Sequence, residues 1–331
     1  MDRYVTGKKI VVAGASGLIG TALCASLVAR GDDVLKFVRH SPDRSGEDTA
    51  FWLDPRTGRM IPGTPADGGA DVSFEWDPGV GMLNPSALEG ADAVVVLNGA
   101  PIGDKRWSDE RKRLILTSRT DAVATVTQAM VAMDEPPPVL VTASAIGIYG
   151  DRGDEVLDES SSPGEGFFAD VCTAWEHASR PAVDAGVRVV NARTGIVVGG
   201  RGGALKQMAM PFKLGLGGRI GDGKQWWSWV SDEDCIAGFE HCIDSDVSGP
   251  VNIVSPNPVT NGAFTKALGE ALHRPTVLPV PKLALRAKLG GELAEAIGYV
   301  SHRVQPKVLL ESGFDFRHET VDQALTAALL G

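Results

Sequence analysis

The architecture of this chain can be derived from one segment near its N-terminus, Lys8-Lys9-Ile10-Val11-Val12-Ala13-Gly14-Ala15-Ser16-Gly17-Leu18-Ile19-Gly20. The segment has the pattern of a short apolar strand, a glycine-rich turn and the start of a helix. Such a turn directs backbone N–H groups at an anion, so it predicts a site for a dinucleotide pyrophosphate, with a merely structural turn as the alternative. The residues expected to hold the cofactor are Gly14, Ser16, Gly17, Leu18, Ile19 and Gly20.

Apolar runs of strand length alternate with helical stretches through the first two-thirds of the chain. The predicted strands are Lys9–Ala13, Asp33–Val38, Ala93–Leu97, Val139–Ser144 and Val187–Thr194. The predicted helices between them are Thr21–Arg30, Asp109–Met133 and Ala169–Ala185. This alternation predicts an α/β fold with a Rossmann-type, doubly wound parallel sheet. The loops after the strands are expected to line one crevice.

The expected domains are a Rossmann-type cofactor domain over residues 1–198 and a substrate-side lobe over residues 199–331. A mainly helical C-terminal subdomain is expected from about residue 280. Residues from about 45 to 75 interrupt the alternation and are predicted to be a surface insertion. Within the wider stretch 41–90, which is rich in Gly, Pro and Asp, Phe51-Trp52-Leu53-Asp54-Pro55 is echoed by Phe74-Glu75-Trp76-Asp77-Pro78, which indicates a local duplication such as a hairpin or a strand-like excursion.

Composition narrows the classes of function. The net charge of −10 argues against binding to nucleic acid or to an anionic membrane surface. The N-terminus lacks a secretory pattern and no segment is apolar over about 20 residues, so a cytoplasmic protein is expected. The four cysteines form no metal-ligand pattern, so we expect free thiols and no metal.

The end of the second predicted strand indicates which nucleotide is bound. Sites for NAD(H) usually carry an acid there, whereas this strand ends in Arg39. A guanidinium pairs with a 2′-phosphate, so the sequence favours NADP(H). The alternative is that Arg39 is a solvated loop residue. If Arg39 does bind the 2′-phosphate, Arg44 can share this role.

Several motifs taken together resemble a known family. They are the glycine turn, Ala100–Trp107, Ser118-Arg119, Ser144–Asp151, Ala192–Gly195, Pro211–Gly218 and Ser312–Arg317. The chain resembles the atypical short-chain dehydrogenases/reductases of the sugar-nucleotide epimerase-like branch, also called the cell-division-inhibitor-like epimerase family. The last motif resembles the C-terminal domain of unknown function of that branch. The resemblance implies that Leu97-Asn98-Gly99 runs along the cofactor and that Arg119 contributes to its site. Asn98 departs from the Leu-Ala-Gly common in the family.

The resemblance also locates the usual catalytic pair and shows that it is missing. The tyrosine position falls on Phe168 and the lysine position on Cys172, and neither residue can transfer the proton. Tyr149 is a candidate replacement acid and Ser144 a candidate hydrogen-bond donor to substrate, with packing and strand-end roles as their alternatives. Water, Asp151 and Asp170 are the remaining proton sources.

Cations near the expected crevice point to a small, anionic substrate. They are Lys105, Arg106, Lys213 and Arg219, of which the last two lie in a glycine-rich stretch that can form a lid or an ordinary connection.

Two functions remain open. One is an NADP(H)-dependent oxidoreductase or epimerase-like enzyme acting on a small polar or sugar-nucleotide substrate. The other is a non-catalytic NADP(H)-binding protein that senses redox state or regulates a partner. The resemblance also implies a candidate homodimer surface, formed by the helices predicted over Asp109–Met133 and from Ala169.

Overall fold

The computed structural model describes residues 7–39, 51–53, 60–62, 72–200, 202–276 and 279–330. The chain forms two compact units. The first consists of Met1–Ala100, Thr117–Ala143 and Trp175–Val190, and the second of Pro101–Leu116, Ser144–Ala174 and Asn191–Gly331. The expected domains are two contiguous segments that meet at residue 198. Each of the two compact units instead consists of three segments that alternate along the chain.

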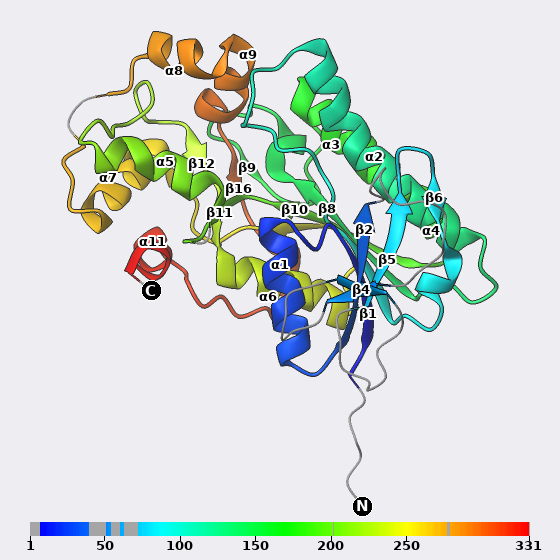
Figure 1. Cartoon of the computed structure of the whole chain (residues 1–331). Coiled ribbons are helices and arrows are strands. Elements are labelled where there is room, and N and C mark those ends of the chain that lie inside the picture. Colours follow the sequence, from blue (N-terminus) through cyan, green and yellow to red (C-terminus); the bar gives the residue numbers. More distant parts are fainter. Residues whose placement is uncertain are drawn as a thin grey trace, which may run out of the picture. The chain divides into compact units, whose positions relative to one another are not determined.

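A parallel sheet forms the centre of the first unit (Figure 1). Its first strands are β1 (Lys9–Ala13), β2 (Asp33–Arg39) and β7 (Ala93–Val96), with β1 paired in parallel to both neighbours. β7 pairs in parallel with β8 (Val139–Ala145), and β10 (Arg188–Thr194) follows β8 in the sheet. The strand order among the described residues is β14-β10-β8-β7-β1-β2-β5-β3-β4. This order confirms the predicted Rossmann-type fold.

The five predicted strands do not include every strand of the sheet. β5 (Val72–Asp77) pairs in parallel with β2, so the second of the two echoed motifs belongs to the sheet and not to a surface insertion. Trp76 is fully buried on β5 and stacks on Phe37 of β2 with ring centroids 5.3 Å apart. The first echoed motif contributes β3 (Phe51–Leu53), which forms a hairpin with β4 (Met60–Pro62). The rest of the expected insertion lies outside the described residues.

Helices pack against this sheet through their apolar residues. α1 (Leu18–Ala29) begins directly after Gly17, buries Leu23 and Leu27, and contacts β1 and β2. α2 (Asp109–Val131) buries residues such as Val126 against the strands. Because both faces are covered, β1 is apolar at every position after Lys9 and is fully buried there.

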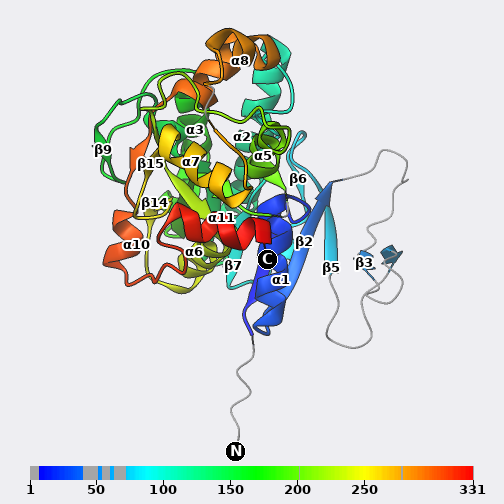
Figure 2. The ribbon, with the colours of Figure 1, turned by 90° about the vertical axis from the view of Figure 1, so that its left-hand side faces the viewer.

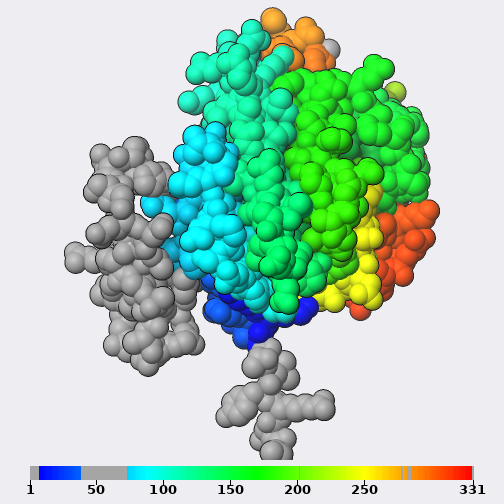
Figure 3. All heavy atoms as spheres, turned by 90° about the vertical axis from the view of Figure 1, so that its right-hand side faces the viewer, coloured from blue at the N-terminus to red at the C-terminus, as the bar shows by residue number. Residues whose placement is uncertain are grey.

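The helix predicted over Ala169–Ala185 is divided in two. α3 (Phe167–His177) ends before α4 (Arg180–Asp184), which has Pro181 in its first turn, a position where proline is tolerated. After β5 the chain forms β6 (Met82–Leu83) and the 3₁₀ helix Pro85–Leu88. Figure 3 shows this cyan segment beside α2, where Thr125 donates a hydrogen bond to the Pro78 carbonyl.

The second unit is mixed in its first part and mainly helical towards the C-terminus. Its remaining elements are the 3₁₀ helix Ile146–Tyr149, β9 (Val156–Leu157), β11 (Ile196–Val198), α5 (Gly203–Lys213), β12 (Trp226–Trp227), β13 (Trp229–Ser231), α6 (Asp232–Asp244), β14 (Gly249–Ile253), β15 (Val259–Thr260), α7 (Asn261–Ala271), α8 (Lys282–Leu289), α9 (Gly291–Ala294), the π-helical turn Glu295–Tyr299, β16 (Arg303–Val304), α10 (Lys307–Glu311) and α11 (Val321–Leu330). α11 packs beside α7 (Figure 2).

Part of the glycine-rich stretch expected to form a lid is helical. Lys213 is the last residue of α5, whose Leu205 and Phe212 are buried in the core of the second unit. Trp227 and Trp229 are buried in the same core and are therefore packing residues. The four cysteines, all of which the structure describes, are buried and are not linked by disulfides.

No helix among the described residues has both the length and the apolar character to cross a membrane. The same residues hold no group of three histidine, cysteine or carboxylate side chains arranged to bind a metal ion.

Gly20 is expected to be a stringent packing position. A Cβ atom there would overlap the Gly14 carbonyl oxygen and lie 2.9 Å from the Ala15 Cα atom. Gly20→Ala should therefore lower the free energy of unfolding by about 1–3 kcal/mol, the usual effect of overpacking. Urea unfolding measures it. Gly103→Ala is the matched control, since nothing lies within 4 Å of its Cβ position. Equal stability of the two variants would contradict the packing argument.

Candidate functional site

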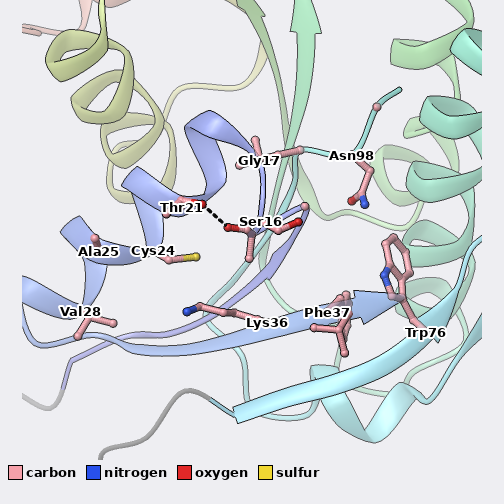
Figure 4. A pocket seen from close by; sticks show the side chains of 15 residues that line it. Ser16, Gly17, Thr21, Cys24, Ala25, Val28, Lys36, Phe37, Trp76 and Asn98 are labelled. Atoms are coloured by element: carbon pink, nitrogen blue, oxygen red, sulfur yellow. Dashed lines mark hydrogen bonds between the residues drawn. The ribbon is translucent and has the colours of Figure 1, made fainter. Parts of the chain in front are cut away.

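A cavity of about 840 Å³ lies at the carboxyl ends of the central strands of the first unit (Figure 4). The turn after β1, the end of β2, Trp76 of β5 and the segment after β7 all contribute to its wall. Its lining residues are Gly14–Gly17, Thr21, Cys24, Ala25, Val28, Lys36–Val38, Trp76 and Leu97–Gly99. Parallel α/β sheets bind their ligands at this edge.

The glycine turn forms one end of the cavity with little room for side chains. Gly14 has a φ of +85°, and a Cβ atom there would lie 2.8 Å from the Leu97 carbonyl carbon. Gly17 is the N-cap of α1 and provides no side-chain cap, although its own N–H donates to the Gly14 carbonyl at 3.0 Å. The first turn of a helix has N–H groups without intrahelical acceptors. Exposed N–H groups at a helix N-terminus fit a phosphate, so the residues present fit a dinucleotide.

The predicted segment Leu97-Asn98-Gly99 lines the cavity, but Arg119 has another position. Its side chain is 6% exposed, and its Nη2 donates to the Ala100 carbonyl at 3.1 Å. A Cβ atom on Gly99 would lie 2.9 Å from the Arg119 Cζ, and this guanidinium also lies 5.0 Å from the Trp175 ring centroid. Arg119 therefore supports the loop that lines the cavity and is not itself among the described lining residues.

Lys36 is a site residue that the sequence prediction missed. It lines the cavity from β2, and Figure 4 shows its side chain extending toward α1. Among the described lining residues it is the only one with a formally charged side chain. A lysine between the apolar pairs Val34-Leu35 and Phe37-Val38 was a signal available in the sequence, since a charge within an apolar run seldom lacks a polar partner or a ligand.

Arg39 is the last residue of β2 and lies opposite Trp76 in the sheet. Its side chain falls outside the described residues, as do His40 and Arg44. Its interaction with a 2′-phosphate stays a prediction.

In the second unit, the positions of the usual catalytic pair are part of an apolar cluster. Cys172 is fully buried with Ile146, Ile148 and Leu157, and Phe168 packs against them. A Cβ atom on Gly147 would overlap the Phe168 ring, so this ring lies directly on the backbone at Gly147. These two positions serve packing.

Tyr149 is a core residue. Its side chain is fully buried, and its hydroxyl donates to Asn252 Oδ1 at 2.8 Å and accepts from Arg193 Nη1 at 2.9 Å. Burial raises the pKa of the Tyr149 hydroxyl above its usual range, although the adjacent Arg193 charge opposes this shift. The interpretation of Tyr149 as a replacement acid is not supported, because its proton is committed to an internal bond. Arg193 is likewise buried, at 6% exposure.

The comparisons with known proteins place the chain. The model of the NAD dependent epimerase/dehydratase family matches residues 10–254. The chain belongs to this family. A domain of unknown function (DUF1731) matches residues 280–328, as the tail motif predicted.

Relatives of this epimerase-family chain extend over nearly its whole length. The epimerase family protein Mb2239 of Mycobacterium bovis is 40% identical over 317 residues, which cover 96% of each chain. The crystal structure of human epimerase family protein SDR39U1 with NADPH is 29% identical, with a TM-score of 0.80, and the match covers 97% of this chain and 99% of the human one. The nucleoside-diphosphate sugar epimerase of Corynebacterium glutamicum is 31% identical with a TM-score of 0.74. There the match covers 97% of this chain and 58% of the other.

The candidate substrate residues of this epimerase-family chain occupy separate segments of the second unit. Lys105, Lys213 and Arg219 are exposed. Arg106 donates a hydrogen bond to the Ala287 carbonyl in the last turn of α8, a favourable position for a cation. Ser144 lies near the end of β8 and is 3% exposed. The substrate roles of these five residues stay predictions.

Two further titratable groups of the second unit are partly buried. Glu159 is linked to Tyr149 through Asn252, and His302 interacts with the Gly150 backbone and with Asp151. Glu159 accepts hydrogen bonds from the Asn252 and Val308 N–H groups, and burial raises the pKa of its carboxyl group. Burial of the His302 ring lowers its pKa to about 4, against the opposing charge of Asp151. His302 is therefore neutral near pH 7.

Tyr149→Phe is expected to destabilise the protein. The substitution removes the hydroxyl that donates to Asn252 Oδ1 and accepts from Arg193 Nη1. Both partner groups stay buried without this hydrogen bond, which should lower the free energy of unfolding by about 1–3 kcal/mol. Urea unfolding at pH 7.5 measures the loss. Unchanged stability would contradict the structural role of the hydroxyl group.

His302 is expected to link stability to pH. Its pKa in the folded state is about 4, below the ordinary value of 6.5. The contribution of the neutral His302 ring to the free energy of unfolding is therefore present above pH 6.5 and is lost as the pH falls towards 4. From pH 7.5 to 4.5 this loss amounts to about 2–3 kcal/mol. His302→Gln cannot be protonated and should lose that much less stability over the same range. Parallel stability curves for variant and wild type, from urea unfolding, would exclude the linkage.

Proposed function

We propose that this chain binds NADPH in the cavity of the first unit and is an NADP(H)-dependent oxidoreductase or epimerase-like enzyme for a small polar or sugar-nucleotide substrate. The observation that carries the proposal is the composition of the cavity. It combines the uncapped N-terminus of α1 with the ammonium group of Lys36, and no acid is among the described lining residues. An anionic dinucleotide with a 2′-phosphate fits this environment better than one with a free 2′-hydroxyl, for which such sites usually supply a carboxylate.

Each part of the site has an expected role. The backbone at Ser16–Ile19 holds the pyrophosphate, and Gly17 leaves room for its approach. Lys36 and Arg39 neutralise the 2′-phosphate, and Leu97–Gly99 lines the nucleoside. When bound, the cofactor supplies a hydride or accepts one. The NADPH in the human SDR39U1 structure, whose fold matches this chain, supports the assignment.

The second unit constrains how a proton would be supplied. Phe168 has no proton to donate, and Cys172 has no permanent charge and is sealed in an apolar cluster. Any proton must come from water or from a side chain other than the usual tyrosine, with Ser144, Asp151 and Asp170 as the candidates. Alignment of the cofactor and the substrate then supplies much of the rate acceleration.

A second candidate function is favoured by the same residues. The apolar Phe168–Cys172 positions and the internal bonds of Tyr149 suit a protein that binds NADPH without turnover. Such a protein would report the NADPH level to a partner through its stability or conformation.

Thermal unfolding tests the cofactor assignment. NADPH at about 100 times its dissociation constant should stabilise the chain by about 2.7 kcal/mol, and NADH at the same concentration should stabilise it much less. Lys36→Met and Arg39→Ala should each narrow the difference between the two dinucleotides, since each removes a cation from the 2′-phosphate. Lys206→Met, at an exposed position on α5, is the control and should bind as wild type does. Equal stabilisation by NADPH and NADH would contradict the assignment.

Single-turnover kinetics separates the two functions. The NADPH complex is mixed with small carbonyl compounds and keto-sugar nucleotides, the NADP+ complex is mixed with sugar nucleotides, and NADPH absorbance is followed in both. An enzyme should oxidise NADPH or reduce NADP+ with at least one class of substrate. Cofactor binding without either change across both panels would instead favour the regulatory function.

A further inference from the structure

The side-chain amide of Asn98 has no role in the proposed function. Asn98 lines the cavity, and its Oδ1 is buried without a hydrogen-bond partner among the described residues. An unsatisfied buried amide oxygen costs free energy, so such a group in a binding site indicates a missing donor. Rotation about the Cβ–Cγ bond, a broad torsion in asparagine, exchanges the amide oxygen and nitrogen, so either atom can face the cavity.

The surroundings of Asn98 suit a flat aromatic group. Trp76 and Phe37 line the same cavity, and their rings stack on each other at 5.3 Å. Figure 4 shows Asn98 and Trp76 at the same end of the cavity, with Thr21, Cys24 and Val28 of α1 at the other. Aromatic side chains exclude water and strengthen a hydrogen bond made beside them.

The chemistry of the amide identifies the ligand group. A carboxamide can accept a hydrogen bond through its oxygen and donate one through its nitrogen in a single plane. Adenine presents a matching pair, an exocyclic amino donor beside a ring-nitrogen acceptor, and asparagine is the side chain that reads this pair in nucleic acids. The phosphates offer no such pair. The carboxamide of nicotinamide does, but Asn98 lines the same cavity as Lys36 and Trp76, on the side of β2 and β5 where the adenosine half with its 2′-phosphate is proposed to bind.

We infer that Asn98 recognises the adenine base of the bound dinucleotide, through an acceptor bond from the exocyclic amino group and a donor bond to the adjacent ring nitrogen. The inference rests on the proposed NADPH function and adds the base specificity of the same site. Asn98 is thus a specificity-determining residue that selects adenine over a base with a carbonyl group at that position.

The test compares NADPH with its hypoxanthine analogue, in which a carbonyl oxygen replaces the exocyclic amino group. Dissociation constants are measured by titration calorimetry. Wild type should bind NADPH about tenfold or more tightly than the analogue. Asn98→Ala should lose most of this discrimination, chiefly through weaker NADPH binding. The substitution places at this position the residue common in similar proteins, so the variant should fold.

Two controls make the outcome decisive. Lys36→Met removes a cation that is proposed to contact the 2′-phosphate, which both dinucleotides carry. It should therefore weaken the binding of both by the same factor and leave the ratio of their dissociation constants unchanged. Asn98→Asp retains an acceptor but lacks the amide donor and adds a charge, so it should bind NADPH less tightly than wild type. If Asn98→Ala weakens both dinucleotides equally, or neither, Asn98 does not read the base. If wild type binds neither dinucleotide, the proposed function itself fails.

Discussion

The close approach of the first turn of α1 to the end of β1 is the constraint on which the site depends. Gly14 and Gly20 allow it, because Cβ atoms at these positions would meet the Leu97 backbone and the Gly14 carbonyl oxygen. The approach places the uncapped N–H groups of α1 beside the segment after β7, and the cavity lies between them. Binding of an anion therefore follows from backbone geometry, and the side chains at the rim add selectivity.

The second unit shows how a family fold can lose one chemistry while it keeps its packing. The positions that would carry a proton donor and its charged neighbour hold Phe168 and Cys172, which complete an apolar cluster. Tyr149 is tied to Asn252 and Arg193 inside the core, and Asn252 is tied in turn to Glu159. A buried network of this kind stabilises one arrangement of the chain, but it leaves no proton for a substrate.

Much of the fold could be predicted because β1, the glycine turn and α1 carry strong local signals. β5 alternates apolar and polar residues as a half-buried strand does, but it was missed because glycine, proline and aspartate are frequent in the residues around it and the segment was interpreted as part of an insertion. The glycine cradle and Asn98 were predicted as site residues from motifs. Arg119 and Tyr149 were predicted from motifs, but no local pattern encodes the contacts that the structure shows for them, with Ala100, Trp175, Asn252 and Arg193. Lys36 could have been found from its charge between the apolar pairs Val34-Leu35 and Phe37-Val38 of β2.

The central claim is that the cavity of the first unit selects an adenosine that carries a 2′-phosphate. Calorimetric titration with adenosine 2′,5′-bisphosphate and with adenosine 5′-diphosphate tests it most directly, since both lack the nicotinamide half. The account predicts that the 2′,5′-bisphosphate binds about tenfold or more tightly, because it alone places a dianion beside Lys36 and Arg39. Equal affinity, or tighter binding of the 5′-diphosphate, would contradict it.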